Sequence, residues 1–465
     1  MVEAFVRLIL PLVSSTRYAS VLGLGFGDCG KGHFVDALTR RWQAHTVVRF
    51  SGGAQAGHNV VTPAEHGSPE RHHTFSQFGA GTLAAGTRTV LLDPMIIHPT
   101  ALLVEAGALS RINVNDALSR LTIDAQCIVT TPYHQAAGRL RELLRGNFAH
   151  GTCGVGVGET VRHALSHPGL VMRYADLSQK TTIQAHGQLD KLHSIRETLL
   201  AELLPQCSNS RNKALTLEIK TLQDEALAAK WFNAAAALAR QCPPASTEMI
   251  GLQLKQTGCV LFEGAQGILL DEWRGFHPHT TWSSITTDAV EAATARFDLS
   301  APIEHYGVLR TYLTRHGTGP LPTHDESLDE FLPEPHNSSH GWQGRFRRGN
   351  PDAVLLRYAL DVIGPLTGLL ISHLEVFQQG LSLKWSEHYM RHSSPESSPL
   401  INRIPVGAHQ DLSHQESLTQ LLTKVQPQYA LEPISSDRDY LDRLASVTAL
   451  PIVFRSYGKT HADVR

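Results

Sequence analysis

Along the chain, apolar runs of strand length alternate with longer stretches whose apolar positions recur every three to four residues. The first apolar run, at 18–26, ends in glycines, and a helical pattern follows it at 31–42. Further runs of strand length, each leading into a loop, lie at 45–53, 87–94, 259–267, 307–314, 367–377 and 450–458. This alternation predicts an α/β fold with a large, mainly parallel central sheet and helices on both faces.

One segment, 179–241, departs from this alternation. It is rich in Leu, Ala, Lys and Glu and has few β-branched runs, so it predicts a helical insertion. We therefore expect a single domain over 18–465 that contains this insertion, preceded by an N-terminal extension at 1–17. In folds of this kind, ligands bind where loops leave the carboxyl ends of the strands.

The composition narrows the class of protein. Lys and Arg number 41 against 43 Asp and Glu, for a net charge of −2, so no basic surface for nucleic acid is indicated. The six cysteines include no C-x-x-C pair, which is typical of free thiols in a reducing compartment. The apolar start of the chain carries Glu3 and Arg7 and matches a signal peptide poorly. We expect a cytoplasmic protein with no nucleic-acid partner and no membrane partner.

Residues 25–31 have the G-x-x-x-x-G-K spacing of a phosphate-binding loop between a strand and a helix. Lys31 can supply a mobile cation, and glycines let backbone N–H groups converge on a phosphate. These glycines are Gly25, Gly27, Gly30 and Gly32. The alternative is a plain glycine-rich turn.

Two features of this loop are unusual. Gly32 stands where such loops carry a Ser or Thr whose hydroxyl binds magnesium. Asp28 places a carboxylate among the expected phosphates, which is compatible with a metal ligand or a base. We therefore expect Asp28 to do the work of the missing hydroxyl.

A second glycine-rich loop, at 51–61, follows the second predicted strand and contains His58. A histidine in such a loop can be a general acid, or it can serve only in capping or packing. Because Asp28 and His58 follow neighbouring strands of the predicted sheet, they could face one ligand from two sides.

Five ordered blocks carry a resemblance to a known family. They read "GFGDCGKGHFVDALT", "VVRFSGGAQAGHNVV", "HGTCGVGVGET", "FEGAQGILLD" and "GVLRTYLTRHGTGPLPT". Together they resemble the adenylosuccinate synthetases, from about Ser20 to the C-terminus. The forms "GWQGRFR" and "SHLEVF" are similar to the archaeal and phage-like branch of that family.

The resemblance implies a ligase that acts in two steps. GTP phosphorylates the 6-oxygen of IMP, and the amino group of L-aspartate then displaces phosphate to give adenylosuccinate. In this family pattern Asp28 is the base at N1 and a ligand of Mg²⁺, His58 is the acid, and Lys31 neutralises the transferring phosphoryl group. The backbone carbonyl of Gly57 is the further metal ligand. The family is also homodimeric, so a second copy of the chain is the expected partner.

The resemblance also assigns the contacts to IMP. Besides Asp28 and His58, they are Gln55, Ala56, Gly57, Cys153, His167, Gln266, Thr281 and Arg345. Three of them depart from the common family pattern: Gln55 replaces Asn, Cys153 replaces Thr, and His167 replaces an Arg that reaches the 5′-phosphate from the neighbouring subunit.

The sites for aspartate and for the triphosphate follow from the same resemblance. The aspartate loop comprises Gly341, Trp342, Gln343, Gly344, Arg345 and Arg347, with Arg345 also on the ribose and Arg347 on the carboxylates. The triphosphate contacts are Gly27, Gly30, Lys31, Gly32, His373, Glu375, Ser456, Tyr457 and Gly458. Of these, His373 stands at a Lys position and Glu375 at the Asp position that holds guanine.

Three other functions stay open at this stage. A related synthetase acts on a guanine nucleotide, such as dGMP, to make 2-aminoadenylosuccinate; that branch has Ser where this chain has Asp28. A catalytically silent nucleotide-binding paralogue is disfavoured by intact Asp28, Lys31 and His58, but the changes at Cys153, His167 and Glu375 keep it possible. A generic phosphate-loop kinase is disfavoured by Gly32 and by the other four blocks.

Overall fold

The structure is a computed structural model. It describes residues 16–64, 69–179, 181–207, 212–334, 337, 341–392 and 399–465. Residues 1–15 of the expected N-terminal extension lie outside this range.

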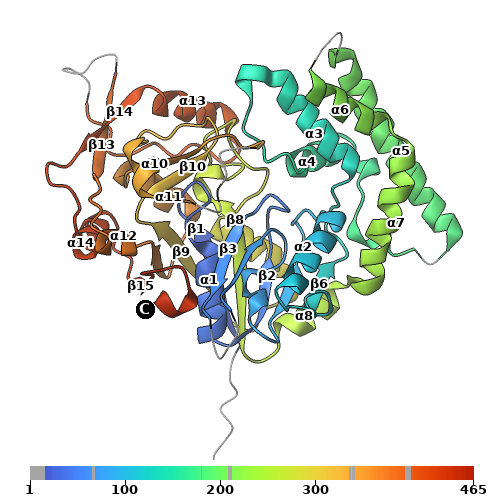
Figure 1. Ribbon diagram of the computed structural model, residues 1–465, viewed down its shortest axis with the longest axis horizontal. Helices are drawn as coiled ribbons and strands as arrows, with labels where there is room; N and C mark the ends of the chain where they lie inside the picture. The colour runs from blue at the N-terminus through green and yellow to red at the C-terminus, as the bar shows by residue number, and fades with distance from the viewer. Residues whose placement is uncertain are drawn as a thin grey trace, which may run out of the picture.

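A nine-stranded sheet forms the centre of the molecule (Figure 1). Its strand order is β15-β12-β9-β1-β8-β2-β5-β6-β7, and every hydrogen-bonded pair of neighbours is parallel. The strands are β1 (Arg17–Gly23), β2 (Ala44–Arg49), β5 (Arg88–Leu91), β6 (Leu121–Asp124), β7 (Pro244–Ala245), β8 (Cys259–Gly267), β9 (Ile303–Arg310), β12 (Gly368–Ser372) and β15 (Ile452–Arg455). The prediction of a mainly parallel α/β sheet is confirmed.

Side chains of neighbouring residues in one strand project from opposite faces of the sheet, and both faces are covered by helices and so are buried. Along β1, Tyr18 and Leu22 join one hydrophobic cluster, whereas Ala19 and Val21 join the other. The first cluster takes side chains from α8 (Thr247–Leu254), α9 (Thr287–Thr294), α11 (Ala353–Ile363) and α14 (Asp437–Val447). The second takes them from α1 (Lys31–Arg41) and α2 (Pro99–Arg111).

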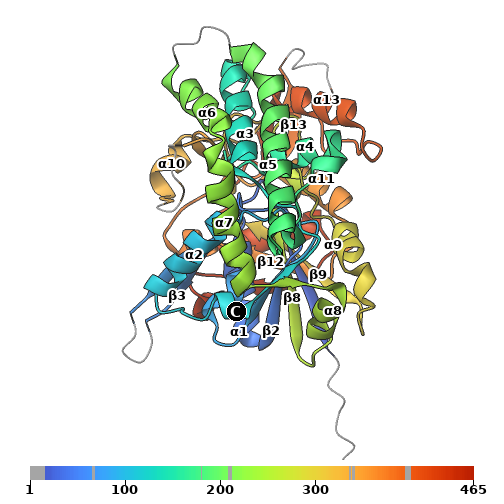
Figure 2. The same ribbon diagram turned by 90° about the vertical axis from the view of Figure 1, so that its right-hand side faces the viewer.

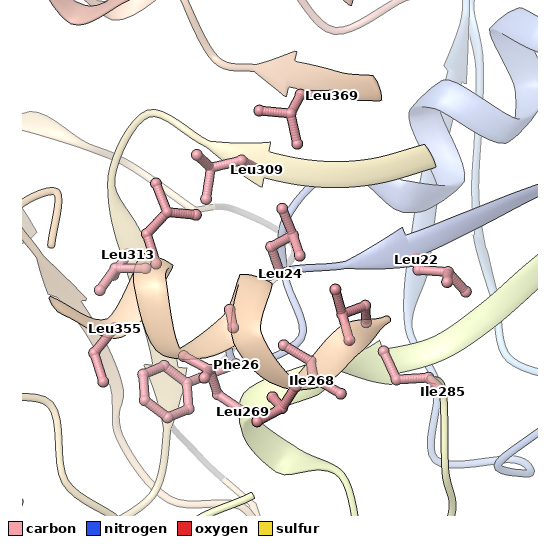
Figure 3. Close-up of a cluster of buried hydrophobic side chains, with 14 of the residues drawn as sticks. Leu22, Leu24, Phe26, Ile268, Leu269, Ile285, Leu309, Leu313, Leu355 and Leu369 are labelled. Atoms are coloured by element: carbon pink, nitrogen blue, oxygen red, sulfur yellow. The ribbon is translucent and has the colours of Figure 1, made fainter. Parts of the chain in front are cut away.

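Figure 3 shows part of the first cluster. Leu24, Leu309 and Leu369 follow or belong to three neighbouring strands, and Leu355 approaches them from α11. These side chains are fixed under the carboxyl ends of the strands, so the loops above them leave from a rigid base.

The segment 179–241 is helical over its described part, as predicted. It contains α5 (Thr182–Leu203), α6 (Lys213–Gln223) and α7 (Ala226–Gln241). Of these, α5 and α6 pack on α3 (Pro132–Arg145), which also contacts α4 (Val157–Ser166), whereas α7 packs on α5 and α2 (Figure 2). No helix among the described residues is long and apolar enough to cross a bilayer.

Short elements surround the sheet. The antiparallel pairs are β3 (His58–Thr62) with β4 (Arg71–Phe75), β10 (Leu313–His316) with β11 (Phe346–Gly349), and β13 (Ser386–Arg391) with β14 (Val425–Tyr429). The remaining α-helices of the described residues are α10 (Ser327–Phe331), α12 (Glu375–Gln378) and α13 (Leu412–Leu422).

The expectation of one continuous strand at 307–314 is wrong. The parallel strand β9 ends at Arg310, and β10 begins at Leu313 and pairs with β11 instead. Thr311 ties the bend to the end of β12, since its N–H donates to the carbonyl of Ser372 (3.2 Å) and its hydroxyl to that of His373 (3.0 Å). The bend directs β10 over the phosphate loop.

Candidate active site

A cavity of about 320 Å³ opens at the carboxyl ends of the central strands. It is lined by the loop after β1, the start of β3, the end of β9 and the loops after β12 and β15. Of the residues predicted to act on ligands, those that line it are Gly27, Asp28, Gly30, Lys31, Gly32, Gly57, His58, His373, Glu375, Ser456 and Gly458. Segments up to about 430 positions apart in the chain thus meet where α/β folds place their ligands.

The phosphate loop has the backbone shape that its glycines predict. Gly27 (φ 122°) and Gly30 (φ 92°) are in the left-handed region that favours glycine. Lys31 is the first residue of α1, so the positive end of the helix dipole adds to its charge. The Lys31 Nζ is buried and donates to the Gly27 carbonyl (2.6 Å), which directs the cation back over the loop.

The packing of His58 explains why glycine replaces Ser or Thr at position 32. A Cβ on Gly32 would lie 2.7 Å from the Cβ of His58 and 3.2 Å from its backbone. Real Cβ atoms essentially never show a contact as short as 2.7 Å, so β3 can pass this close to α1 only when residue 32 is glycine. The metal-binding hydroxyl is excluded by the approach of the second loop.

Gly32→Ser is therefore expected to remove activity rather than to restore a conventional phosphate loop. The added Cβ must displace His58, and overpacking of this kind costs about 1–3 kcal/mol of stability. Turnover and the free energy of unfolding by urea would be measured together. The matched control is Gly107→Ser, because a Cβ on that helical glycine of α2 meets nothing within 4 Å. A fully active Gly32→Ser enzyme would contradict the steric explanation.

Asp28 is held through its backbone and presents its carboxylate to the cavity. Its carbonyl accepts hydrogen bonds from the Thr314 hydroxyl (3.1 Å) and from Arg310 (3.4 Å). The carboxylate is 29% exposed, and its Oδ2 lies 3.7 Å from the Nε2 of His316. The carboxylate of Asp28 is therefore partly open to a ligand or metal ion.

His58 forms a buried pair with Glu263, a residue that the sequence did not reveal. The Nδ1 of His58 contacts the Glu263 carboxylate, whose other oxygen accepts the N–H of Ala80 (2.9 Å). Burial disfavours the charge of Glu263, but His58, Arg49 and the Ala80 N–H outweigh it and lower the pKa of this carboxyl. Burial lowers the pKa of His58, opposed by Glu263.

This pairing sets the tautomer of His58. A neutral imidazole has one N–H, and an ionised Glu263 accepts it at Nδ1. The Nε2 lies 3.1 Å from the carbonyl of Ala265, which can only accept, so the hydrogen bond there forms when Nε2 also carries a proton. Protonated on both nitrogens, His58 donates to Glu263 and to Ala265, and its Nε2–H is the proton that it can pass to a ligand.

The far end of the cavity contains the residues predicted to hold the base of the triphosphate. His373 adopts φ 63°, a left-handed conformation that is rare outside glycine and is found at functional sites. The Oε2 of Glu375 is buried and has no hydrogen-bond partner within the described residues, and burial raises the pKa of this carboxyl. The side chain of Tyr457 points elsewhere, to Asp437 (2.8 Å).

The donor groups around Asp28 fit a magnesium ion. Mg²⁺ prefers oxygen ligands and is commonly held by one or two carboxylates together with substrate phosphates and water. The Asp28 carboxylate and the Gly57 backbone line the same cavity as the phosphate loop. Within the described residues, no cluster of three or more His, Cys, Asp or Glu side chains could hold a metal ion by itself. This agrees with a site in which the phosphates of a bound nucleotide supply the remaining metal ligands.

Two glutamines predicted to contact IMP lie together beside Gly52, outside the lining of this cavity. Both polar atoms of the Gln55 amide and the Oε1 of Gln266 are buried without a hydrogen-bond partner in the described part of the chain. The Nε2 of Gln266 donates to the carbonyl of Ser283 (2.8 Å). Buried amides left unpaired are costly, so their positions are consistent with a polar ligand. Ala56 is buried next to them.

The structure does not bring the other IMP positions to the cavity. His167 stacks on His163, with ring centroids 4.8 Å apart. Burial raises the pKa of Cys153 to about 11. Thr281 is half-buried, and its N–H donates to the carbonyl of Leu270 (2.8 Å). The roles of these three residues stay predictions.

The aspartate loop lies over the glycine-rich segment 151–154. The Trp342 ring covers Gly154, where a Cβ would meet it at 2.6 Å, and the Arg139 guanidinium lies 5.5 Å from the ring centre. Gly341 (φ 131°) and Gly344 (φ 75°) both have a positive φ that favours glycine, and Gln343 lies between them in the loop. This loop therefore packs through Trp342.

The two arginines of this loop differ. Arg345 is exposed and pairs with Glu326 (3.1 Å) and Asp329 (2.8 Å), so contact with a ribose would require it to leave these partners. Arg347 is half-buried and donates to the carbonyl of Gly319 (2.5 Å), and its Nε has no partner among the residues described. Burial lowers the pKa of Arg347, which favours an anionic partner.

The fold and the site define a nucleotide-dependent enzyme of the parallel α/β class, and comparison with known proteins identifies its family. The chain belongs to the adenylosuccinate synthetase family, whose model matches residues 20–465. It is 29% identical to the adenylosuccinate synthetase of Aliivibrio fischeri over 94% of this chain and 95% of that protein. It is 33% identical to that of Shewanella amazonensis over 77% of this chain and 76% of that protein.

Two solved structures share the fold. The fully ligated adenylosuccinate synthetase from Plasmodium falciparum matches with a TM-score of 0.73 and 20% identity, over 96% of this chain and 99% of that one. The succinoaminodeoxyadenylate synthetase of cyanophage S-2L, bound to dGMP and to dATP as an energy donor, matches with a TM-score of 0.60 and 15% identity. The match covers 97% of this chain and 95% of that one. At these identities the likeness establishes the fold alone.

Proposed function

We propose that this protein joins IMP to L-aspartate, forming adenylosuccinate, and that GTP drives the reaction through 6-phosphoryl-IMP. The observation that supports this most directly is that Asp28, Lys31 and His58 line one cavity at the carboxyl ends of the strands. A base, a phosphoryl-binding cation and an acid are the three groups that this chemistry needs.

In the first step, the 6-oxygen of IMP becomes a nucleophile when N1 loses its proton. Asp28 accepts that proton, and the oxygen attacks the γ-phosphorus of GTP with release of GDP. Lys31 and the loop N–H groups bind the transferring phosphoryl group. Mg²⁺, held by Asp28 and the Gly57 carbonyl, would neutralise charge on the phosphate oxygens.

In the second step, the amino group of aspartate attacks C6 and phosphate leaves. The amine loses a proton as the C–N bond forms, and the departing phosphate must be stabilised. We assign both tasks to His58: its Nδ1 is held by Glu263, its Nε2 takes up the proton of the amine, and the resulting imidazolium donates that proton to the departing phosphate. Arg347 is the group that we assign to the aspartate carboxylates, since guanidinium groups bind carboxylates in a bidentate manner.

The deciding experiment is an assay with purified protein, IMP, aspartate, GTP and Mg²⁺. We expect adenylosuccinate absorbance and inorganic phosphate to appear in equal amounts, and neither to form when any one component is omitted. Absence of both products, with nucleotide still bound, would indicate the silent paralogue. Gel filtration of the same sample tests the proposed homodimer, and cell fractionation tests the proposed cytoplasmic location.

A second acceptor is worth testing because the structural relatives include a synthetase bound to dGMP. Guanine has a 2-amino group beside N1, and the Asp28 carboxylate that takes the N1 proton crowds it. Steric exclusion of this kind discriminates more strongly than a missing contact does. We therefore expect IMP to have a higher kcat/KM than dGMP in direct competition. The reverse order would assign the 2-aminoadenylosuccinate synthetase activity instead.

Glu375 is proposed to read the guanine of GTP, through its N1–H and 2-amino group. Glu375→Gln can accept only one of these two hydrogen bonds, and a hydrogen bond to a charged group contributes about 1.5–3 kcal/mol. We expect the KM for GTP to rise roughly tenfold or more and the preference for GTP over ATP to shrink, while the KM for IMP stays unchanged. Turnover of the unmodified enzyme with ATP alone, and none with GTP, would refute this role.

A further inference from the structure

His316 contacts Asp28, a residue of the catalytic cavity, although no role for His316 was predicted from the sequence. It is the last residue of β10, whose strand partner β11 carries Arg347. Its Nε2 is 3.7 Å from the Oδ2 of Asp28, and the two side chains are 21% and 29% exposed. A histidine therefore adjoins the group that the proposed function uses as its base.

The strand β10 holds Asp28 in two places. Residues 314 and 316 are two apart in a strand, so their side chains project from the same face. Thr314 donates its hydroxyl to the backbone carbonyl of Asp28, and His316 faces the carboxylate. Arg315 projects the other way, and its guanidinium lies 4.2 Å from the centre of the Phe26 ring. Backbone and side chain of Asp28 are thus fixed by one element.

The imidazole of His316 is itself well fixed. Its ring lies 4.7 Å from the ring of Phe346, its partner across the β10–β11 ladder. Its Nδ1 is buried without a hydrogen-bond partner in the described part of the chain. A buried N–H without an acceptor is rarer than a buried lone pair, so the single proton of the neutral ring belongs on Nε2. That N–H then faces Asp28.

We propose that His316 is a positioning residue for the reaction. Its Nε2–H attracts the Asp28 carboxylate and restricts the rotation of that side chain, so that one oxygen stays directed at the acceptor base. A separation of 3.7 Å is an electrostatic contact that a small side-chain rotation converts to a hydrogen bond. This role rests on the proposed function, in which Asp28 takes the N1 proton.

The test compares His316→Gln, which keeps an N–H donor, with His316→Met, which has similar bulk and none. We expect kcat of His316→Met to fall about 10–100-fold, the loss typical when a residue that orients an active-site ligand is removed. The KM for GTP should stay unchanged, because His316 is not among the residues that line the cavity. His316→Gln should recover most of the rate. Equal unfolding temperatures would show that both variants are folded.

His305 offers the matched control. It lies on β9 outside the cavity, and its Nε2 is 3.3 Å from the Glu291 carboxylate. His305→Met should leave kcat unchanged. The proposal is overturned if His316→Met keeps the kcat of the unmodified enzyme, if His316→Gln is equally impaired, or if His305→Met loses as much. If His316→Met does not fold, His316→Val, which suits a strand, replaces it. An inactive unmodified enzyme would instead refute the proposed function.

Discussion

Asp28→Asn is expected to reduce kcat by about 10²–10⁴-fold, the contribution typical of a positioned general base. Asparagine keeps the size of the side chain but cannot accept the N1 proton, and it weakens the oxygen ligand offered to Mg²⁺. Stability should change little, because the tertiary hydrogen bonds to Asp28 are made by its backbone carbonyl. Single-turnover phosphorylation of IMP without aspartate would isolate the affected step.

The matched control is Asp361→Asn, which removes a carboxylate of nearly equal exposure, 30% against 29%, from an ion pair with Arg403. That pair lies outside the cavity, so kcat should be unaffected. Normal turnover by Asp28→Asn would refute its role as base and leave the phosphate loop with a binding function only.

Glu263→Gln is expected to lower both kcat and the stability of the fold. The carboxylate accepts two hydrogen bonds, from the Nδ1–H of His58 and from the N–H of Ala80. An amide has one acceptor oxygen, so one of these buried donors must face an NH₂ group. An unsatisfied buried donor costs about 1–3 kcal/mol, measured as the change in unfolding free energy. Loss of His58 orientation should reduce kcat by about 10–100-fold.

Glu105→Gln separates the two effects. Glu105 is also buried, accepts the N–H groups of Ser76 (2.8 Å) and Gln77 (2.9 Å), and lies 3.7 Å from a histidine, His73. It is outside the cavity, so its variant should be destabilised with kcat unchanged. If Glu263→Gln behaves in the same way, Glu263 is a structural residue and does not orient His58.

Much of the fold could be predicted from the chain because its signals are local. The run 259–267 is apolar and β-rich, and it forms β8 with those bounds. The helix expected from residue 31 is α1 (Lys31–Arg41). The prediction of one strand at 307–314 was wrong because the apolar pattern continues through the bend at Thr311. There the chain leaves the central sheet and enters the β10–β11 pair. Periodicity reports which side chains are buried and does not report which strand they pair with.

The candidate site was predicted in part. The phosphate loop with Asp28 and Lys31 meets His58 in one cavity, as the positions of their loops implied, and Glu375, which was assigned by the family resemblance, lines the same cavity. Others were assigned by family pattern alone. Arg345 is one of these, and in the structure it pairs with Glu326 and Asp329. The roles of the residues assigned in this way stay predictions, because the partner of a side chain cannot be read from the residues beside it in sequence.

The sequence by itself determined the strand–helix alternation, the glycine-rich loop and the family, since each depends on residues that are close in the chain. Only the tertiary structure decided which groups act together. Glu263 meets His58 across 205 positions, and His316 meets Asp28 through the bend after β9. Gly32 is needed because β3 passes within contact distance of α1. The physical reason is that short-range contacts between side chains depend on how distant segments pack, which no local pattern of residues encodes.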